Sequence, residues 1–314
     1  MFQHARIPFA LALAATLVAC GDDNDDTNSN PTPQPNIVEL AQATPELSIL
    51  VEAVVAADLA GALSGPGPLT VFAPTNAAFA ALLEELDVTK EELLANDELL
   101  TAVLQYHVIG ARVRAADIQS GKAVEPLAGG FFKIDLDGGA VITDGRNRTA
   151  NITTTDLQAR NGVVHLVDRV ILPADKNIVE LAASLPDFSI LVEAVEAAGL
   201  VDTLSGPGPF TVFAPTNAAF AALLGELGVT KEQLLANTDL LTAVLTYHVL
   251  PARALEADVV PGTQPASAQG QAFEISSGFV ITDGRDRTAN IAGTDVLASN
   301  GVIHVIDRVI LPSE

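Results

Sequence analysis

The sequence predicts an α+β fold that is built twice, with short helices followed by an antiparallel sheet in each unit. Two observations predict it. Residues 70–83 read TVFAPTNAAFAALL, and residues 211–224 repeat the same letters. Within each unit, apolar residues first recur at the helical spacing i, i+3, i+4, and later alternate every second residue, as they do in strands. Helices that precede a run of strands favour an α+β arrangement.

The spacing between the copies sets the domain organisation. Solenoid repeats are about 20–50 residues long, and these copies lie 141 positions apart (211 minus 70), so each is large enough to bury its own core. We expect a first domain at residues 36–173, called the first repeat below, and a second at 177–312, the second repeat. The linker of residues 174–176 is too short for free tumbling, so we expect a defined angle between the domains.

The first half of each unit carries helix signals in order. In the first repeat, Asn36 is expected to cap a helix, and Pro45 to begin the next. The turn SGPGP at residues 64–68 ends this helical part, and TVFA at residues 70–73 is expected to form a short buried strand. Thr75 is then expected to cap a further helix.

The second half changes from helical to strand periodicity. Thr89 with Glu92 forms a capping box for another short helix. One more helix follows, and its apolar stripe ends at His107. Strands are then predicted at residues 131–137, 140–145, 149–154 and 162–172, separated by glycine-containing turns.

The N-terminal sequence has the features of a processing signal. Residues 1–19 have a weakly basic start, a mostly apolar stretch and small residues at the end, which together predict a signal peptide. The ending LVAC resembles the bacterial lipobox, which implies that Cys20 is lipidated. Residues 20–35 are acidic and proline-rich, so they are expected to form a disordered tether. Gly21 after the cysteine favours the outer membrane or cell surface of a bacterial envelope, with some of the protein secreted.

Composition excludes several classes of function. The net charge is −23 and neither repeat has a basic patch, so nucleic acid and anionic lipid headgroups are poor partners. Membrane contact is expected only through the lipid anchor, because no apolar run approaches the 18 or so residues of a spanning helix. No GxSxG motif, phosphate loop or HExxH motif occurs, and no cofactor or enzymatic activity is expected.

Three motifs in register resemble the fasciclin domain family. They are TVFAPTNAAF at residues 70–79, the Tyr-His pair at 106–107, and NGVVHLVDRVILP at 161–173, and all recur in the second repeat. The resemblance implies two tandem fasciclin-like domains, each a wedge-shaped β-sandwich flanked by short helices. It also implies a secreted or membrane-anchored protein associated with adhesion, in a family not known as an enzyme class.

The resemblance implies partner-binding residues as well. In animal relatives, integrin binding is attributed to the Tyr-His segment and to an Asp-Ile pair five residues before the Asn-Gly of the last motif. This chain keeps the aspartate of that pair and changes the isoleucine, which supports a surface-exposed contact region more than a named receptor. The candidate residues are Tyr106, His107, Asp156 and Leu157 in the first repeat, and Tyr247, His248, Asp295 and Val296 in the second.

The residues themselves leave other readings open. A histidine on an apolar stripe is more often a hydrogen-bonded core residue, and Asp156 and Asp295 serve equally well in turns. No metal site is predicted at DLDGG (135–139), because Arg146 occupies the position of the bidentate glutamate. A cluster of His107, His165 and Asp168 stays open as a metal alternative.

These observations lead to one expectation and one alternative. We expect a lipid-anchored extracytoplasmic protein that adheres to a cell-surface or matrix protein or to a polysaccharide through its two domains. The alternative is a periplasmic or surface module that binds a small ligand or a metal. The alternative predicts that His107 and His248 are accessible in a pocket, whereas adhesion with a structural Tyr-His pair predicts that they are buried.

Overall fold

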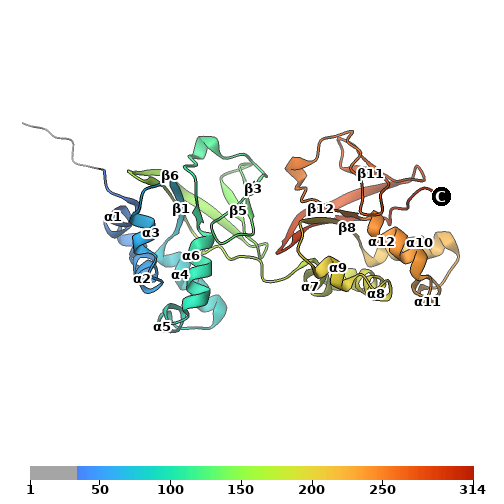
Figure 1. The fold of residues 1–314 in the computed structure, drawn as a ribbon, viewed down its shortest axis with the longest axis horizontal. Helices are drawn as coiled ribbons and strands as arrows, with labels where there is room; N and C mark the ends of the chain where they lie inside the picture. Colours follow the sequence, from blue (N-terminus) through green and yellow to red (C-terminus); the bar gives the residue numbers. More distant parts are fainter. Residues whose placement is uncertain (1–33) are drawn as a thin grey trace, which may run out of the picture. The chain divides into compact units, whose positions relative to one another are not determined.

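The computed structural model describes residues 34–314, and both repeats have nearly the same order of elements (Figure 1). The predicted signal peptide (1–19), the lipidation at Cys20 and nearly all of the tether lie outside the described residues. No helix in the described part of the chain is long and apolar enough to cross a membrane.

Most helices of each repeat precede the strand meander in sequence, and they lie beside the sheet (Figure 1). The first repeat contains α1 (Ile37–Gln42), η1 (Pro45–Leu47), α2 (Ser48–Ala56), α3 (Ala60–Ser64), α4 (Asn76–Leu86), α5 (Lys90–Leu94), α6 (Asp97–Tyr106) and η2 (Ala115–Asp117). The second repeat contains α7 (Ile178–Ala183), η3 (Pro186–Phe188), α8 (Ser189–Ala197), α9 (Val201–Ser205), α10 (Asn217–Leu227), α11 (Lys231–Leu235), α12 (Thr238–Tyr247) and η4 (Glu256–Asp258).

The predicted helix caps are present. The Asn36 side chain accepts a hydrogen bond from the Glu39 N–H, and the Glu39 carboxylate accepts one from the Asn36 N–H, so the two residues form a capping box. Thr75 accepts from the Ala78 N–H at the start of α4, and Thr89 forms a second capping box with Glu92. These local signals explain why the helical boundaries could be predicted from short motifs.

One curled sheet runs through each repeat. In the first repeat its strand order is β2-β1-β7-β6-β5-β4-β3, and in the second it is β10-β11-β12-β13-β8-β9. The first sheet consists of β1 (Leu69–Pro74), β2 (Val108–Ile109), β3 (Ala123–Val124), β4 (Phe132–Asp135), β5 (Val141–Thr143), β6 (Thr149–Ala159) and β7 (Gly162–Val167). The second consists of β8 (Phe210–Pro215), β9 (Val249–Leu250), β10 (Glu274–Ile275), β11 (Val280–Thr282), β12 (Thr288–Ala298) and β13 (Gly301–Ile306).

The sheet differs from the sequence prediction in two ways. It is not wholly antiparallel, because β1 pairs in parallel with β7, as β8 does with β13. The chain enters β1 before the later helices and returns through the meander, and this path brings β7 alongside β1 in the same direction. The strand predicted at residues 162–172 is also too long, because β7 ends at Val167 and the buried segment 170–172 continues without strand pairing.

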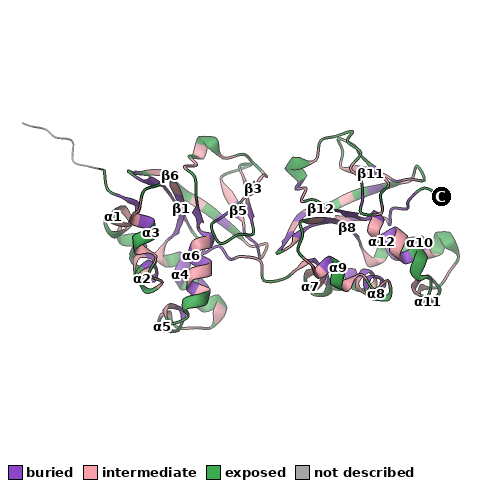
Figure 2. Cartoon of the chain, in the orientation of Figure 1, coloured by how far each residue is buried: buried purple, intermediate pink, exposed green. Residues whose placement is uncertain are grey.

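Each repeat has two apolar cores. In the first repeat one core lies between the helices and the sheet, and it includes Leu50, Phe79 and Leu100. A second lies within the curl of the sheet and includes Phe72 and Tyr106. The helices therefore bury one side and expose the other (Figure 2). The fold is α+β, as the sequence predicts, and the second core corresponds to the predicted sandwich.

Candidate functional site

The Tyr-His segment is part of the core in both repeats. Tyr106 and Tyr247 are 0% exposed, and His107 and His248 are each 1% exposed. The Tyr106 hydroxyl donates to the Phe131 carbonyl at 2.6 Å, and burial raises the pKa of this tyrosine. None of these four side chains reaches the surface, so a partner cannot contact them in the folded domain.

Both ring nitrogens of His107 are used inside the protein. Nδ1 donates to the Val103 carbonyl at 2.7 Å, near the end of α6, and Nε2 accepts the Ile171 N–H at 3.0 Å. His248 makes the equivalent two bonds, to Val244 and Ile310. Burial lowers the pKa of both histidines to about 4. The Tyr-His segment thus secures the last turn of the helix to the chain after the final strand.

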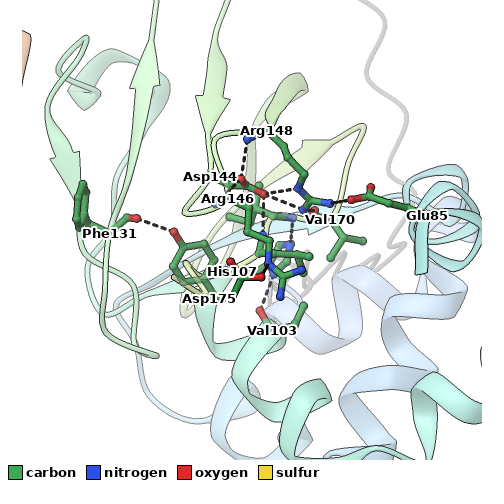
Figure 3. A network of polar contacts seen from close by, with 12 residues as sticks. Glu85, Val103, His107, Phe131, Asp144, Arg146, Arg148, Val170 and Asp175 are labelled. Carbon is green, nitrogen blue, oxygen red and sulfur yellow. Dashed lines mark hydrogen bonds and ion pairs between the residues drawn. The ribbon is translucent and has the colours of Figure 1, made fainter. Parts of the chain in front are cut away.

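A buried carboxylate, Asp144, lies close to His107 and organises the same region (Figure 3). Asp144 is 1% exposed and accepts the backbone N–H groups of Arg146, Arg148 and Leu172, each at 2.9 Å. The Arg148 guanidinium donates to the same carboxylate at 2.8 Å and to Glu85 at 2.7 Å. A buried carboxylate with this many donors is a structural anchor, because each lone pair is satisfied within the fold.

The cavities beside the two histidines are too small for an ordinary ligand. Each has a volume of about 30 Å³, and its lining is almost wholly apolar. Small-molecule sites are typically about 300–1,000 Å³. Because His107 and His248 are buried and lack a free nitrogen, these cavities do not favour the ligand-binding or metal-binding alternative.

The structure does not assemble the metal cluster that the sequence left open. His165 donates through Nε2 to the Val113 carbonyl and accepts the Asp156 N–H through Nδ1. Asp168 instead pairs with Asn151. Across residues 34–314, no group of three histidine, cysteine or carboxylate side chains is arranged to hold a metal ion.

Asp156 lies at an irregularity in β6, where its register with β7 shifts. It adopts a left-handed backbone conformation with φ 60°, which aspartate tolerates better than most residues. Its Oδ1 accepts the Ala115 N–H at 3.0 Å, so the aspartate ties η2 to the sheet. Asp156 therefore lies at a bulge within a strand and not in a turn between strands, and its other carboxylate oxygen has no hydrogen-bond donor within the described residues. The neighbouring Leu157 is half-buried against the helical core.

Asp295 has the same backbone geometry and a different environment. Its φ is 57°, and its Oδ1 accepts the Glu256 N–H at 2.8 Å. Its Oδ2 is paired with Lys133 of the first repeat at 2.9 Å, and the residue is 5% exposed. Burial acts to lower the pKa of Lys133, but the hydrogen bond and charge of Asp295 raise it overall. Val296, like Leu157, is half-buried against the core. Asp295 is thus occupied by the chain itself, whereas Asp156 is half-exposed.

Sequence reasoning missed the residues that join the two repeats. Lys133, Phe131 and Asn147 of the first repeat contact Asp295, Arg253 and Leu297 of the second. A signal was present, since positions 131, 133 and 147 differ from their counterparts Ala272, Glu274 and Asp286, while the surrounding motifs are nearly identical. Differences between copies at surface positions could have indicated this contact.

Comparison with known proteins agrees with the duplicated fold. Residues 45–173 and 186–312 each match the family model described as "Fasciclin domain". Transforming growth factor-beta-induced protein ig-h3 of Sus scrofa is 34% identical over 254 residues, covering 80% of this chain and 35% of that protein. The chain thus spans about a third of the length of this mammalian relative.

A bacterial relative and a solved structure extend the comparison. Protein sll1483 of Synechocystis is 46% identical over 166 residues, covering 52% of this chain and 85% of that protein. The FAS1 domain pair from the insect cell adhesion molecule Fasciclin I has 18% identity and a TM-score of 0.43, covering 84% of this chain and 97% of that one. The chain belongs to the fasciclin domain family, with one fasciclin domain in each of its two repeats.

Proposed function

We propose that this protein is a lipid-anchored, extracytoplasmic adhesion protein that binds a cell-surface or matrix protein or a polysaccharide. Proteins with fasciclin domains are in general adhesion or extracellular interaction proteins, and the relatives of this chain are non-enzymatic. We therefore propose no catalytic role. The membrane would be reached only through the lipid on Cys20, and the protein would be held at the bacterial cell envelope.

One observation carries the choice of contact site. The two repeats have the same Asp-containing bulge, but Asp295 is buried against Lys133, whereas Asp156 is half-exposed and no donor in residues 34–314 reaches one of its carboxylate oxygens. A partner that binds the aspartate of this bulge would therefore reach it in the first repeat and not in the second. We propose that Asp156 and the surface around it make the principal contact, and that the Tyr-His segments act indirectly by holding the fold.

The adhesion proposal can be tested with beads coated with residues 21–314. The beads are exposed to the producing cells, to collagen and to surface polysaccharides, and retention is measured against uncoated beads. Asp156→Asn is the informative variant, because asparagine keeps the Oδ1 acceptor for the Ala115 N–H and tolerates the left-handed backbone while the charge is lost. We expect this variant to lose most of its retention.

A matched control is available on the same repeat. Asp58 is exposed and also has a positive φ, of 55°, so Asp58→Asn removes the same charge from a similar backbone at another place. Beads coated with this control should be retained as strongly as beads coated with the unchanged protein. If no surface retains the unchanged protein, or if both variants behave alike, adhesion through Asp156 is wrong.

The lipid anchor needs a separate experiment. We expect the full chain to incorporate a radiolabelled fatty acid and to sediment with membranes, and Cys20→Ser to abolish both. Labelling that persists in the serine variant would contradict lipidation at Cys20. This outcome would not affect the adhesion proposal, because the bead assay uses protein without that cysteine.

A further inference from the structure

The two repeats meet through complementary faces that carry opposite charges. On the first repeat the contacting residues, called the docking face, are Lys122, Glu125, Phe131, Lys133 and Asn147. On the second repeat the contacting residues, called the receiving face, are Arg253, Leu255, Asp258, Asp295 and Leu297. One domain offers one surface and its neighbour offers another, so the contact is heterologous.

Each residue of the docking face has a definite partner. Lys133 pairs with Asp295 at 2.9 Å, Lys122 with Asp258 at 2.8 Å, and Glu125 with Arg253 at 2.7 Å. These three ion pairs define the polar part of the contact.

An apolar contact and a pair of amide hydrogen bonds complete it. The Arg253 guanidinium lies 4.5 Å above the Phe131 ring, and Phe131 packs with Leu255 and Leu297. The Asn147 carboxamide accepts the Leu297 N–H at 2.6 Å and donates to the Leu297 carbonyl at 3.0 Å. The docking chemistry is therefore two lysines, one carboxylate, one aromatic ring and one carboxamide.

The second repeat has lost this docking chemistry at the equivalent positions. The equivalence is set by the fold: Lys133 and Glu274 pair with Thr143 and Thr282, and the two tyrosine hydroxyls donate to the carbonyls of Phe131 and Ala272. The five counterparts of the docking face, Thr263, Ala266, Ala272, Glu274 and Asp286, are all exposed.

The first repeat keeps the charged residues of the receiving face at its equivalent positions. Arg112, Asp117 and Asp156 correspond to Arg253, Asp258 and Asp295, and all three charges are retained. The apolar part is changed, because Arg114 replaces Leu255 and Gln158 replaces Leu297, and both replacements are exposed. Within the described residues, no other part of the chain covers this face as the first repeat covers its counterpart.

We propose that this receiving face of the first repeat binds another protein that presents two lysines, a carboxylate, an aromatic ring and a carboxamide in the arrangement of the docking face. The internal contact between the repeats is the template. The three charges that pair with Lys133, Lys122 and Glu125 in that contact all have equivalents in the first repeat. The inference deepens the proposed adhesion function and rests on it, since it specifies the chemistry of the partner at the Asp156 surface.

The same comparison excludes a second copy of this chain as the partner in this geometry. A second copy would offer its second repeat, which places Glu274 where Lys133 would be, opposite Asp156. Like charges in contact across an interface oppose binding and suppress wrong partners. The first repeat's own docking face is already occupied by the second repeat. The unchanged protein is therefore expected not to extend into head-to-tail chains.

The proposal can be tested by restoring the docking chemistry in the second repeat of a protein that spans residues 21–314. The grafted variant combines T263K, A266E, A272F, E274K and D286N, all at exposed positions. We expect the unchanged chain to sediment as a monomer from about 10 µM to about 500 µM, a range that detects weak interfaces. The weight-average mass of the grafted variant should at least double at the upper concentration.

Two further variants decide whether the association uses the receiving face. Adding Asp156→Asn to the graft should return it to a monomer, whereas adding Asp58→Asn should not. A control with E196K and T203K changes two exposed positions of the second repeat and adds the same net charge of +3 (+2 and +1, against +1, −1, 0, +2 and +1 in the graft). This control should stay monomeric.

The outcomes separate this inference from the adhesion proposal. A folded graft that remains monomeric, or one whose association ignores Asp156→Asn, would overturn the inference, even if the beads still show adhesion. If circular dichroism shows that the graft does not fold, the smaller variant A272F, E274K and D286N replaces it, and Asp156-dependent association is again required. Association of the control variant would also overturn it, because charge alone would then suffice.

Discussion

Acidification should destabilise both repeats through their buried histidines. The pKa of His107 and of His248 is about 4 in the folded protein, lowered by burial from an ordinary value of 6.5. Between these two pH values each histidine is protonated in the unfolded chain and neutral in the folded chain. The free energy of unfolding therefore falls as the pH drops below about 6.5, and the loss is complete below about 4.

The magnitude follows from the shift. A fall in pKa from 6.5 to about 4 corresponds to about 3–4 kcal/mol for each histidine, at about 1.4 kcal/mol per pKa unit. The structural reason is the fixed tautomer of His107. A proton on Nε2 would point at the Ile171 N–H, which is itself a donor, in a site that excludes water. One hydrogen bond would be lost and two donors would oppose each other.

Two measurements check this prediction. The C2–H chemical shifts of the histidines, followed by NMR from about pH 7 to about pH 4, should show no titration of His107 or His248 near the ordinary value. Urea unfolding over the same range should show the loss of stability, part of which also comes from carboxylates. The variant His107→Gln isolates the histidine contribution, because its first repeat should lose less stability on acidification.

Either of two results would contradict this pH dependence. The first is a midpoint for His107 near 6.5 in the folded protein, which would mean that the ring is reached by water. The second is an equal acid dependence in His107→Gln and the unchanged chain, which would mean that carboxylates alone set the pH profile. His248 has the equivalent environment, so its titration tests the same prediction a second time in the same protein.

Three further predictions concern buried polar groups. Asp144→Asn should lower the unfolding free energy of the first repeat, measured in urea, by about 3–5 kcal/mol, because it leaves the Arg148 charge without its buried partner. An unfolding free energy equal to that of the unchanged protein would contradict this. Asn161→Ala removes an acceptor for the Ile37 N–H and donors to the Leu63 and Gly65 carbonyls, so melting curves should show a loss of about 3 kcal/mol. Lys133→Met leaves Asp295 without its cation and should speed hydrogen exchange at the Glu256 amide, whereas unchanged protection there would mean that the ion pair is unimportant.

The elements that could be predicted from sequence are those set by local chemistry. The capping boxes at Asn36 and Thr89 each require only residues within one helical turn, so their motifs identified the helices directly. His107 could be placed at the end of an apolar stripe, and its donor bond to Val103 also lies within one turn. The short helix α3 was missed, because it is five residues long and has no side-chain cap.

Features set by distant parts of the chain could not be predicted. The parallel pairing of β1 with β7 depends on how the chain returns after the helices and the meander, and periodicity carries no information on strand direction. The end of the last strand was also misplaced, since the buried segment 170–172 has the composition of a strand. Its pairing is replaced by bonds from Ile171 to His107 and from Leu172 to Asp144, which lie far away in sequence.

The contacts of the candidate site also depend on distant parts of the chain and could not be predicted from local sequence. Comparing the two copies supplies part of the missing information. Residues that are alike in both repeats, such as the Tyr-His pairs, proved to be buried and to serve the fold. Asp156 and Asp295 are also alike in sequence and in backbone conformation, yet only one is buried by a charge from elsewhere in the chain. What separates them is the difference between Lys133 and Glu274, at a position that no family motif includes. In a duplicated protein, residues that agree between copies therefore point to the fold, and residues that differ at equivalent surface positions point to the faces where each copy meets its own partner.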